Sequence, residues 1–324
     1  MADQALFLAG AAFIVLIVAE LLYFKIADRF NIIDKPNERS SHTQITIRGG
    51  GIVFVLAGLV YFVYSVFQLP VFWLAFLAIS AISFADDILT LSSKVRMPVQ
   101  LGAVALMIYA VLPEFNILWF AVALVLITGI INAYNFMDGI NGITAGYSLV
   151  ALVALYVLNV EIDFAPAALI ALFIIADLVF SIFNFRTKAK CFAGDVGSVS
   201  IAFVVVYLIF SLIVKTGNPL FIMLLAVYGV DSVLTILVRL SKRENIFEAH
   251  RSHVYQWLVK PGPFSHLQVS AIYMVVQALI SLTVIAVHTS SASTQWGVAV
   301  GILLALAIAY FLIKKRYKSK FGLV

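Results

Sequence analysis

Apolar runs of about 20 residues recur along the whole chain, and they constrain its fold more than any other feature. Helix of this length crosses the hydrocarbon core of a bilayer. Of the 324 residues, 63% are hydrophobic and only 11% are charged, whereas soluble proteins average about 25% charged residues. The sequence therefore predicts an all-α, polytopic integral membrane protein whose surroundings are the lipid bilayer.

About eleven transmembrane helices are predicted, with boundaries accurate to a few residues. The expected ranges are 5–24, 51–69, 71–84, 98–112, 117–131, 143–160, 166–184, 199–214, 219–238, 267–288 and 296–313. The third and fourth ranges are short, which leaves a re-entrant or tilted helix open for one of them. Because no polar stretch is long enough for a soluble domain, we expect one transmembrane domain over residues 1–324.

The basic residues are divided unevenly between the two sides that these spans define. Twenty of the 21 Lys and Arg residues lie on one side, and only Lys215 lies on the other. Since cytoplasmic loops are enriched in Lys and Arg, we predict an outside N-terminus and a cytoplasmic C-terminus. Because these cations sit in short loops, the net charge of +5 does not indicate a nucleic-acid partner. The predicted cytoplasmic loops are 25–50, 85–97, 132–142, 185–198 and 239–266.

The first two of these loops carry charged residues beside glycines or at a helix end. In the first loop, Arg48 precedes three glycines, which suits either a plain glycine turn or close approach of backbone to an anion. The second loop opens with Asp86-Asp87 and continues to Lys94 and Arg96. Adjacent carboxylates at a membrane edge repel each other. The repulsion is small when the helix end is exposed to solvent, when a cation lies nearby, or when one carboxylate is protonated.

The third and fourth loops supply oxygen ligands. Asn132, Asn135 and Asp138 recur every three residues, so a helical backbone would place them along one face, although Asn/Asp-Gly sequences also form ordinary turns. Asn141 follows in the same loop. In the fourth loop, Asp195 lies between glycines, where it can cap a helix or bind Mg²⁺, which prefers oxygen ligands.

In the fifth loop, His250 and His253 would share a helical face with Arg251 beside them, and such a cluster can hold phosphates. The His-x-x-His spacing alone is a weak indication of zinc. Three acidic residues lie within predicted spans and are functional candidates because charges are costly there: Glu20, Asp177 and Asp231. The single Cys191 excludes an internal disulfide and a cysteine metal cluster.

Taken together, these motifs resemble the polyprenyl-phosphate N-acetylhexosamine-1-phosphate transferases of glycosyltransferase family 4. That family includes the phospho-MurNAc-pentapeptide translocase and the GlcNAc-1-phosphate transferases. The resemblance covers nearly the whole chain. It rests on Asp34-x-Pro-Asn with Arg-Gly-Gly, Asp86-Asp87, Asn135-x-x-Asp138-Gly, Gly194-Asp-x-Gly-Ser and the final histidine cluster. The order of the five motifs, each on the predicted cytoplasmic side, makes the resemblance specific.

Two positions depart from the family pattern. Asn141 stands where the family usually has a second Asp, and an amide cannot act as a base. The chain also lacks the three-histidine run of the translocase branch, which argues against the peptidoglycan substrate. Its His-Arg-Ser-His-Val-Tyr-Gln form is similar to the subgroup that starts O-antigen-type polysaccharides from UDP-FucNAc or UDP-QuiNAc.

The resemblance implies transfer of an N-acetylhexosamine-1-phosphate from a UDP-N-acetyl sugar to undecaprenyl phosphate, with release of UMP, in the bacterial cytoplasmic membrane. Mg²⁺ is the implied cofactor, with Mn²⁺ as the alternative, and a homodimer is left open. Asp195 and Asp138 are the implied metal ligands. The implied catalytic group is Asp86, Asp87, Asp138, His250 and His253; the implied substrate-binding group is Arg48, Lys94, Asn132, Asn135, Asn141, Arg186 and Arg251.

Three other functions fit the sequence less well. An ion-coupled transporter would use Asp177 and Asp231 as its relay, but no internal repeat is evident and the polar residues crowd one face. A CDP-alcohol phosphotransferase would need an Asp-Gly-x-x-Ala-Arg run, which the chain lacks. A non-catalytic scaffold would leave five matching motifs without a use.

Overall fold

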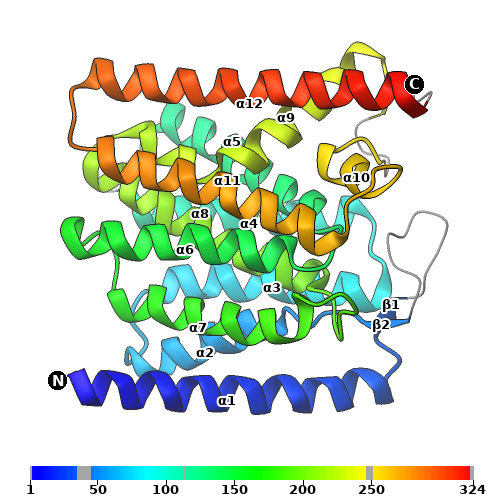
Figure 1. Ribbon diagram of the computed structural model, residues 1–324. Helices are drawn as coiled ribbons and strands as arrows, with labels where there is room; N and C mark the ends of the chain where they lie inside the picture. Colours follow the sequence, from blue (N-terminus) through cyan, green and yellow to red (C-terminus); the bar gives the residue numbers. More distant parts are fainter. Residues whose placement is uncertain (1, 35–44, 113, 115, 246–250, 322–324) are drawn as a thin grey trace.

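The computed structural model describes residues 2–34, 45–112, 114, 116–245 and 251–321. These residues form a bundle of long helices that run roughly side by side, with a small sheet and a short helix at one end (Figure 1). The strands are β1 (Ile33–Asp34) and β2 (Thr46–Ile47). The helices are α1 (Ala2–Arg29), α2 (Ile52–Tyr64), α3 (Pro70–Leu89), α4 (Ser93–Val111), α5 (Ile117–Met137), α6 (Ile143–Ile162), α7 (Ala167–Asn184), α8 (Gly194–Thr216), the 3₁₀ helix η1 (Pro219–Leu225), α9 (Ala226–Ser241), α10 (Val254–Val259), α11 (His266–Val287) and α12 (Ala292–Phe321).

Within the described residues, ten helices are long and apolar enough to cross a membrane, with η1 and α9 together forming one of them. The helix α2, with 13 residues, is shorter. The structure thus agrees with an all-α, polytopic membrane protein, and each predicted range overlaps one of these helices or α2. The count of eleven and the orientation of the termini stay predictions. The two chain ends lie at opposite ends of the bundle (Figure 1).

Several helices run further than their apolar stretches. The helices α3 and α4 have 20 and 19 residues, so neither is too short to cross, contrary to one reading of the sequence. The last turn of α3 carries Asp86 and Asp87, and the last turns of α5 carry Asn132 and Asn135. The helix α8 begins at Gly194, five residues before its predicted range. Four polar residues are therefore held on helix ends rather than on loops: Asp86, Asp87, Asn135 and Asp195.

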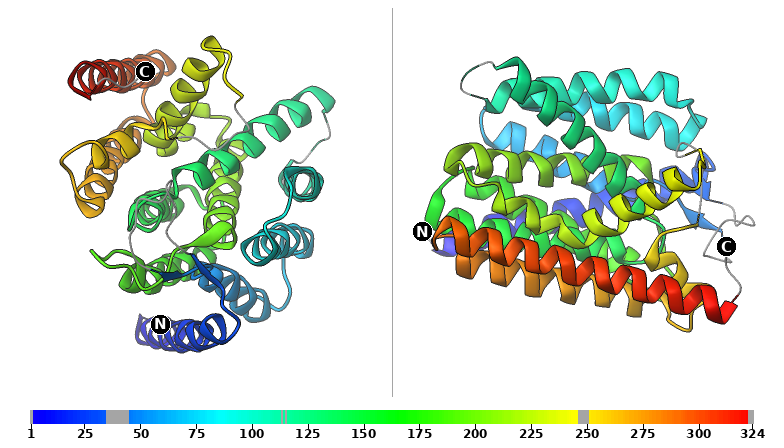
Figure 2. Two further views of the ribbon diagram at one scale, coloured as in Figure 1. Left: turned by 90° about the vertical axis from the view of Figure 1, so that its right-hand side faces the viewer. Right: turned by 90° about the horizontal axis from the view of Figure 1, so that it is seen from above.

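The helix α8 forms the centre of the bundle. Most of its side chains from Val196 to Leu212 are buried, and it packs against α2, α3, α5 and α6. In contrast, α1 and α12 lie on opposite flanks and expose most of their side chains (Figure 2). Where α2 begins, Gly51 faces Gly197, and a Cβ atom on Gly197 would lie 2.6 Å from the Gly51 Cα atom. Glycine is needed for this approach, which brings the segment before α2 against the start of α8.

Backbone hydrogen bonds join the first and fourth predicted loops. The strands β1 and β2 are antiparallel, with Ile33 opposite Ile47, and Ile47 also bridges to Cys191 in parallel. The Phe192 N–H donates to the Ile47 carbonyl over 2.8 Å, and the Gly50 N–H donates to the Phe192 carbonyl over 2.8 Å. Because these bonds lie on both sides of Arg48, they fix its position relative to the start of α8.

Candidate active site

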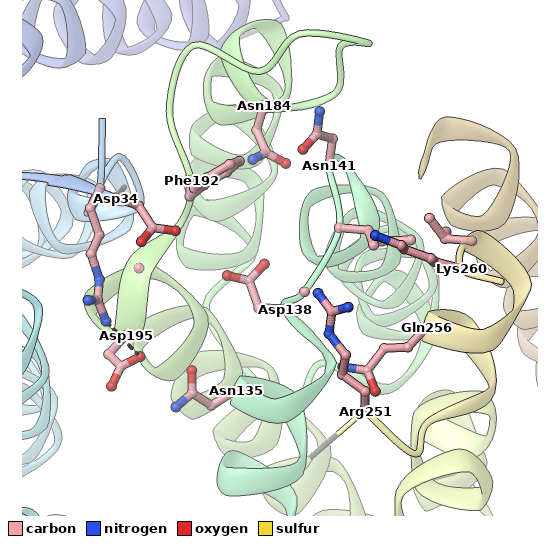
Figure 3. Close-up of a pocket in the computed structure, with 15 residues that line it drawn as sticks. Asp34, Asn135, Asp138, Asn141, Asn184, Phe192, Asp195, Arg251, Gln256 and Lys260 are labelled. Carbon is pink, nitrogen blue, oxygen red and sulfur yellow. Dashed lines mark ion pairs between the residues drawn. The ribbon is translucent and has the colours of Figure 1, made fainter. Parts of the chain in front are cut away.

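A cavity of about 480 Å³ opens at the end of the bundle that carries the sheet and α10 (Figure 3). Its wall is mostly polar and comes from four of the five predicted cytoplasmic loops, together with the end of α7. The lining residues are Asp34, Arg48, Asn135, Asp138, Gly139, Ile140, Asn141, Asn184, Phe192, Gly194, Asp195, Arg251, Gln256, Val259 and Lys260. Motifs far apart in the sequence thus meet at one site.

One wall is built on the first turn of α8, which carries Asp195. The Arg48 guanidinium lies between two carboxylates: its Nε is 2.7 Å from Asp87 Oδ1, and its Nη2 is 3.8 Å from Asp195 Oδ1. The backbone N–H groups of Asp195 and Val196 donate to the two oxygens of Asp87, each over 2.9 Å. Asp87 has no exposed side-chain surface, so it caps α8 and anchors Arg48 instead of facing the cavity.

A second guanidinium holds Asp195 from the other side. Arg96 Nη1 is 2.9 Å from Asp195 Oδ2 and 2.6 Å from Asp86 Oδ2. The Leu91 N–H donates to the other Asp86 oxygen. Neither Asp86 nor Asp87 lines the cavity, so the structure gives both acids a positioning role, and their predicted action on a lipid phosphate stays a prediction.

The end of α5 forms the middle of the site. Asn135 Oδ1 accepts a hydrogen bond of 2.7 Å from Ser198 Oγ, which ties α5 to α8. Asp138 follows the last residue of α5, and its carboxylate points into the cavity, toward the side where Asp34 and Asp195 lie (Figure 3). Burial raises the pKa of Asp138 to about 6. The group is therefore mostly ionised at neutral pH, in a place where a bound cation would lower its energy.

The amide of Asn141 holds the third loop to the fourth. Its Nδ2 donates to the carbonyls of Arg186 (2.9 Å) and Thr187 (3.2 Å). Nearby, Asn184 accepts from the Gly142 N–H over 2.8 Å and donates to the Cys191 carbonyl over 2.9 Å. A carboxylate at position 141 would face two carbonyl oxygens without a proton to donate. This geometry gives a physical reason for the amide that departs from the family pattern.

Asp231 fastens the opposite wall to the bundle. This buried carboxylate on α9 accepts from the Val254 N–H (2.9 Å), the Tyr255 N–H (3.4 Å) and the Tyr273 hydroxyl (2.6 Å). It thereby caps α10, which carries Gln256 and Val259 of the cavity lining. The buried His253 lies with its Nδ1 3.5 Å from Asp231 Oδ1 and does not line the cavity.

The remaining predicted residues fall into two groups. Asn132, Lys94 and Arg186 do not line the cavity; Asn132 bonds the carbonyl of Thr128 within α5, and the other two side chains are exposed. His250 lies outside the described residues. The structure thus brings together Arg48, Asn135, Asp138, Asn141, Asp195 and Arg251 as lining residues.

Five polar residues of the site were missed as candidates: Asp34, Arg96, Asn184, Gln256 and Lys260. The proximity of Arg96 to Asp86-Asp87 in the sequence was a usable signal, since paired carboxylates need a compensating cation. Gln256 follows His253 by three residues in a loop already singled out. Asn184 ends a long apolar run, where nothing in the sequence distinguishes it from an ordinary helix end.

The protein side chains of the cavity supply only part of the ligand set that Mg²⁺ needs. Within the described residues, no group of three or more His, Cys, Asp or Glu side chains converges closely enough to hold a metal. Asp138 and Asp195 are nevertheless two carboxylates on one cavity, with the Asn135 amide beside them. Mg²⁺ is usually bound by one or two carboxylates, with waters and substrate phosphates completing its octahedron. The residues therefore fit a metal that is held jointly with a phosphate ligand.

An apolar groove lies beside the polar cavity. It has a volume of about 690 Å³ and is lined by α5, η1, α9 and α12. On α5 it includes Gly129, Ile130, Ala133 and Tyr134, and Asn135, the next residue, lines the polar cavity. A long hydrocarbon chain in the groove would therefore lead to the polar site.

Comparison with known proteins gives one family. Residues 69–213 match the model of "Glycosyl transferase family 4". A Bacillus subtilis protein described as a probable undecaprenyl-phosphate N-acetylglucosaminyl 1-phosphate transferase is 28% identical over 85% of this chain and 84% of its own length. Two undecaprenyl-phosphate alpha-N-acetylglucosaminyl 1-phosphate transferases, from Yersinia pestis and Escherichia coli K12, are 26% and 25% identical, each over 91% of this chain and 87% of its own length.

Proposed function

We propose that the chain is a glycosyl transferase family 4 enzyme that transfers an N-acetylhexosamine-1-phosphate from a UDP-sugar to undecaprenyl phosphate, releasing UMP. The observation that carries the proposal is a cavity rich in acids and cations and an apolar groove that are lined by consecutive residues of α5, Asn135 and Tyr134. A water-soluble nucleotide sugar and a membrane lipid can meet at such a junction. The donor sugar, and a role in starting a cell-surface polysaccharide of the O-antigen type, belong to the same proposal.

In this reaction, a phosphate oxygen of the lipid attacks the phosphorus that carries the sugar. The bond from that phosphorus to the UMP oxygen breaks, and UMP leaves with the bonding electrons. One diphosphate is exchanged for another, so the step is near thermoneutral and needs positioning and charge neutralisation more than a strong base.

The cavity residues divide these tasks. Arg48, Arg251 and Lys260 neutralise the diphosphate, since all three line the cavity and carry positive charge. Asn135 and Gln256 offer amides to the nucleotide or the sugar. Asp195 and Asp138 would hold Mg²⁺, which, when bound, neutralises developing charge on the phosphate oxygens. Asp86, Asp87 and Arg96 act behind the wall by fixing Arg48 and Asp195.

The proposal also assigns the membrane context. Lipid acceptor chains would lie in the groove along α5, α9 and α12, with the phosphate at Asn135 and Asp138. The protein would sit in the bacterial cytoplasmic membrane with the cavity on the cytoplasmic face, because the basic loops gather at that end. The transporter alternative is left with Asp177 alone for its relay, since Asp231 is occupied in capping α10.

The proposal is tested with purified protein, undecaprenyl phosphate, Mg²⁺ and a panel of UDP-sugars, including UDP-GlcNAc, UDP-FucNAc and UDP-QuiNAc. We expect release of UMP that requires both the lipid phosphate and the metal, with one sugar preferred. Replacing Mg²⁺ by Mn²⁺ should retain activity, and EDTA should abolish it. No turnover with any UDP-N-acetylhexosamine would overturn the proposal.

Filling the groove should weaken binding of the lipid acceptor without weakening binding of the UDP-sugar. Gly229 on α9 lines the groove, and a Cβ atom there meets nothing within 4 Å, so Gly229→Leu is expected to fold and to occupy the path of the lipid. We expect the KM for undecaprenyl phosphate to rise about tenfold, because one or two kcal/mol of apolar contact is displaced, with the KM for the UDP-sugar unchanged. A short-chain polyprenyl phosphate should be affected less. Gly102→Leu on α4, also in open space, is the control; equal effects from both would contradict the assignment.

A further inference from the structure

A second cavity lies at the same end of the bundle and shares no lining residue with the first. It has a volume of about 360 Å³ and is formed by the ends of α9 and α12 with the segment around α10. Its lining residues are Thr235, Val238, Arg239, Lys242, Glu244, Ser252, Trp257, Tyr310, Phe311, Lys314, Lys315 and Lys318. The proposed sugar transfer gives this cavity no task.

The cavity is strongly cationic. Five of its lining residues are Lys or Arg, and Glu244 is its one acid. That acid is already paired, because Arg239 Nε lies 2.9 Å from Glu244 Oε2. Within the described residues, none of the four lysines forms an ion pair with a carboxylate. Four positive charges around one cavity attract an anion and repel one another without it.

The side chains around this cavity favour an anionic lipid over a soluble anion as its ligand. The cavity wall carries Trp257, Tyr310 and Phe311, and Phe311 is 52% exposed on the flank of the bundle. Aromatic side chains and Lys at the end of an apolar helix mark the interface between lipid headgroups and hydrocarbon. The neighbouring Ile308 and Leu312 on α12 are also exposed, so an acyl chain has an apolar surface beside the cationic cavity.

We propose that this cavity binds the headgroup of an anionic phospholipid from the surrounding membrane, with Lys242, Lys315 and Lys318 around its phosphate. Lys314 forms the inner wall: its Nζ donates to the Ser252 carbonyl and lies 3.5 Å from the centre of the Trp257 ring. The Trp257 indole N–H in turn donates to the Arg251 carbonyl over 2.9 Å. The lipid site therefore backs onto the segment that carries Arg251 of the first cavity.

The test is a titration of full-length protein in detergent with phosphatidylglycerol, with bound lipids counted by native mass spectrometry. Parallel titrations use phosphatidylcholine with the same acyl chains, soluble glycerol phosphate and undecaprenyl phosphate. The variant Lys315→Gln/Lys318→Gln removes two cations from the cavity. The matched control Arg316→Gln/Lys320→Gln removes two from the same turns of α12 but outside the lining.

We expect one phosphatidylglycerol molecule to bind in preference to phosphatidylcholine. The cavity variant should lower the affinity for phosphatidylglycerol about tenfold, whereas the control variant should change it less than about threefold. All three proteins should unfold at similar temperatures, because the exchanged side chains are exposed. Equal loss in both variants would overturn the proposal in favour of diffuse surface charge. Displacement of the lipid by glycerol phosphate, or one-for-one by undecaprenyl phosphate, would overturn it in favour of a soluble-anion site or of the acceptor site.

Discussion

Replacing Asp195 by Asn should lower the rate of UMP release about 10³-fold, the largest effect expected of any single change in this site. The amide keeps the shape of the side chain but removes the charge that faces the cavity between Arg48 and Arg96. Both guanidinium groups then lose a partner, and the proposed Mg²⁺ site would keep only one of its two protein carboxylates. The measurement is initial UMP release at saturating UDP-sugar and acceptor, with a Mg²⁺ titration to detect weaker metal binding.

The control for this change is Asp163→Asn. Asp163 is an exposed acid at the end of α6 with a left-handed backbone, which Asn tolerates well, so the same chemical exchange should leave activity unchanged. Full UMP release by Asp195→Asn, with an unaltered Mg²⁺ dependence, would remove Asp195 from the proposed metal site.

Replacing Asp87 by Asn should destabilise the protein by about 3–5 kcal/mol, because it breaks the ion pair of a buried carboxylate and leaves Arg48 with only the longer contact to Asp195. The introduced amide would also direct N–H groups toward the Asp195 and Val196 N–H donors, which now donate to the carboxylate. We expect a clear fall in Tm in detergent, together with loss of UMP release because the first turn of α8 loses its anchor. Asp28→Asn, at an exposed acid on α1, is the control and should leave Tm unchanged.

This second experiment separates two roles for the adjacent acids. A positioning role predicts that Tm and activity fall together. If Asp87 instead took a proton from the lipid phosphate, the variant would lose rate at an unchanged Tm, and that result would contradict the structural assignment.

The sequence predicted the membrane class and the grouping of motifs well, because both depend on properties that are local along the chain. Apolar length alone located the spans, and the basic residues assigned the connecting segments to one side. The helix ends were less predictable. Polar residues such as Asp86, Asn135 and Asp195 look like loop residues by hydropathy, yet they extend the regular helices α3, α5 and α8.

The roles of individual side chains were the least predictable part. His253 was expected to contact phosphate, but it packs against Asp231, which lies 22 residues earlier. Lys94 and Arg186 had the right charge in the right loops and still lie outside the cavity lining. Such outcomes depend on where a side chain is directed after the helices pack, and periodicity within one segment does not contain that information.

The two walls of the cavity are attached by different kinds of bonds. The wall that carries Arg48 is held to the start of α8 through main-chain bonds at Ile47, Gly50 and Phe192. Main-chain bonds survive most side-chain exchanges, so residues of this wall other than Asp87, Gly51 and Gly197 can be replaced without detaching it from α8. The α10 half depends on the side chain of Asp231. Variants that aim to change sugar preference should therefore alter residues 254–260 and keep Asp231, because that side chain holds α10 in place.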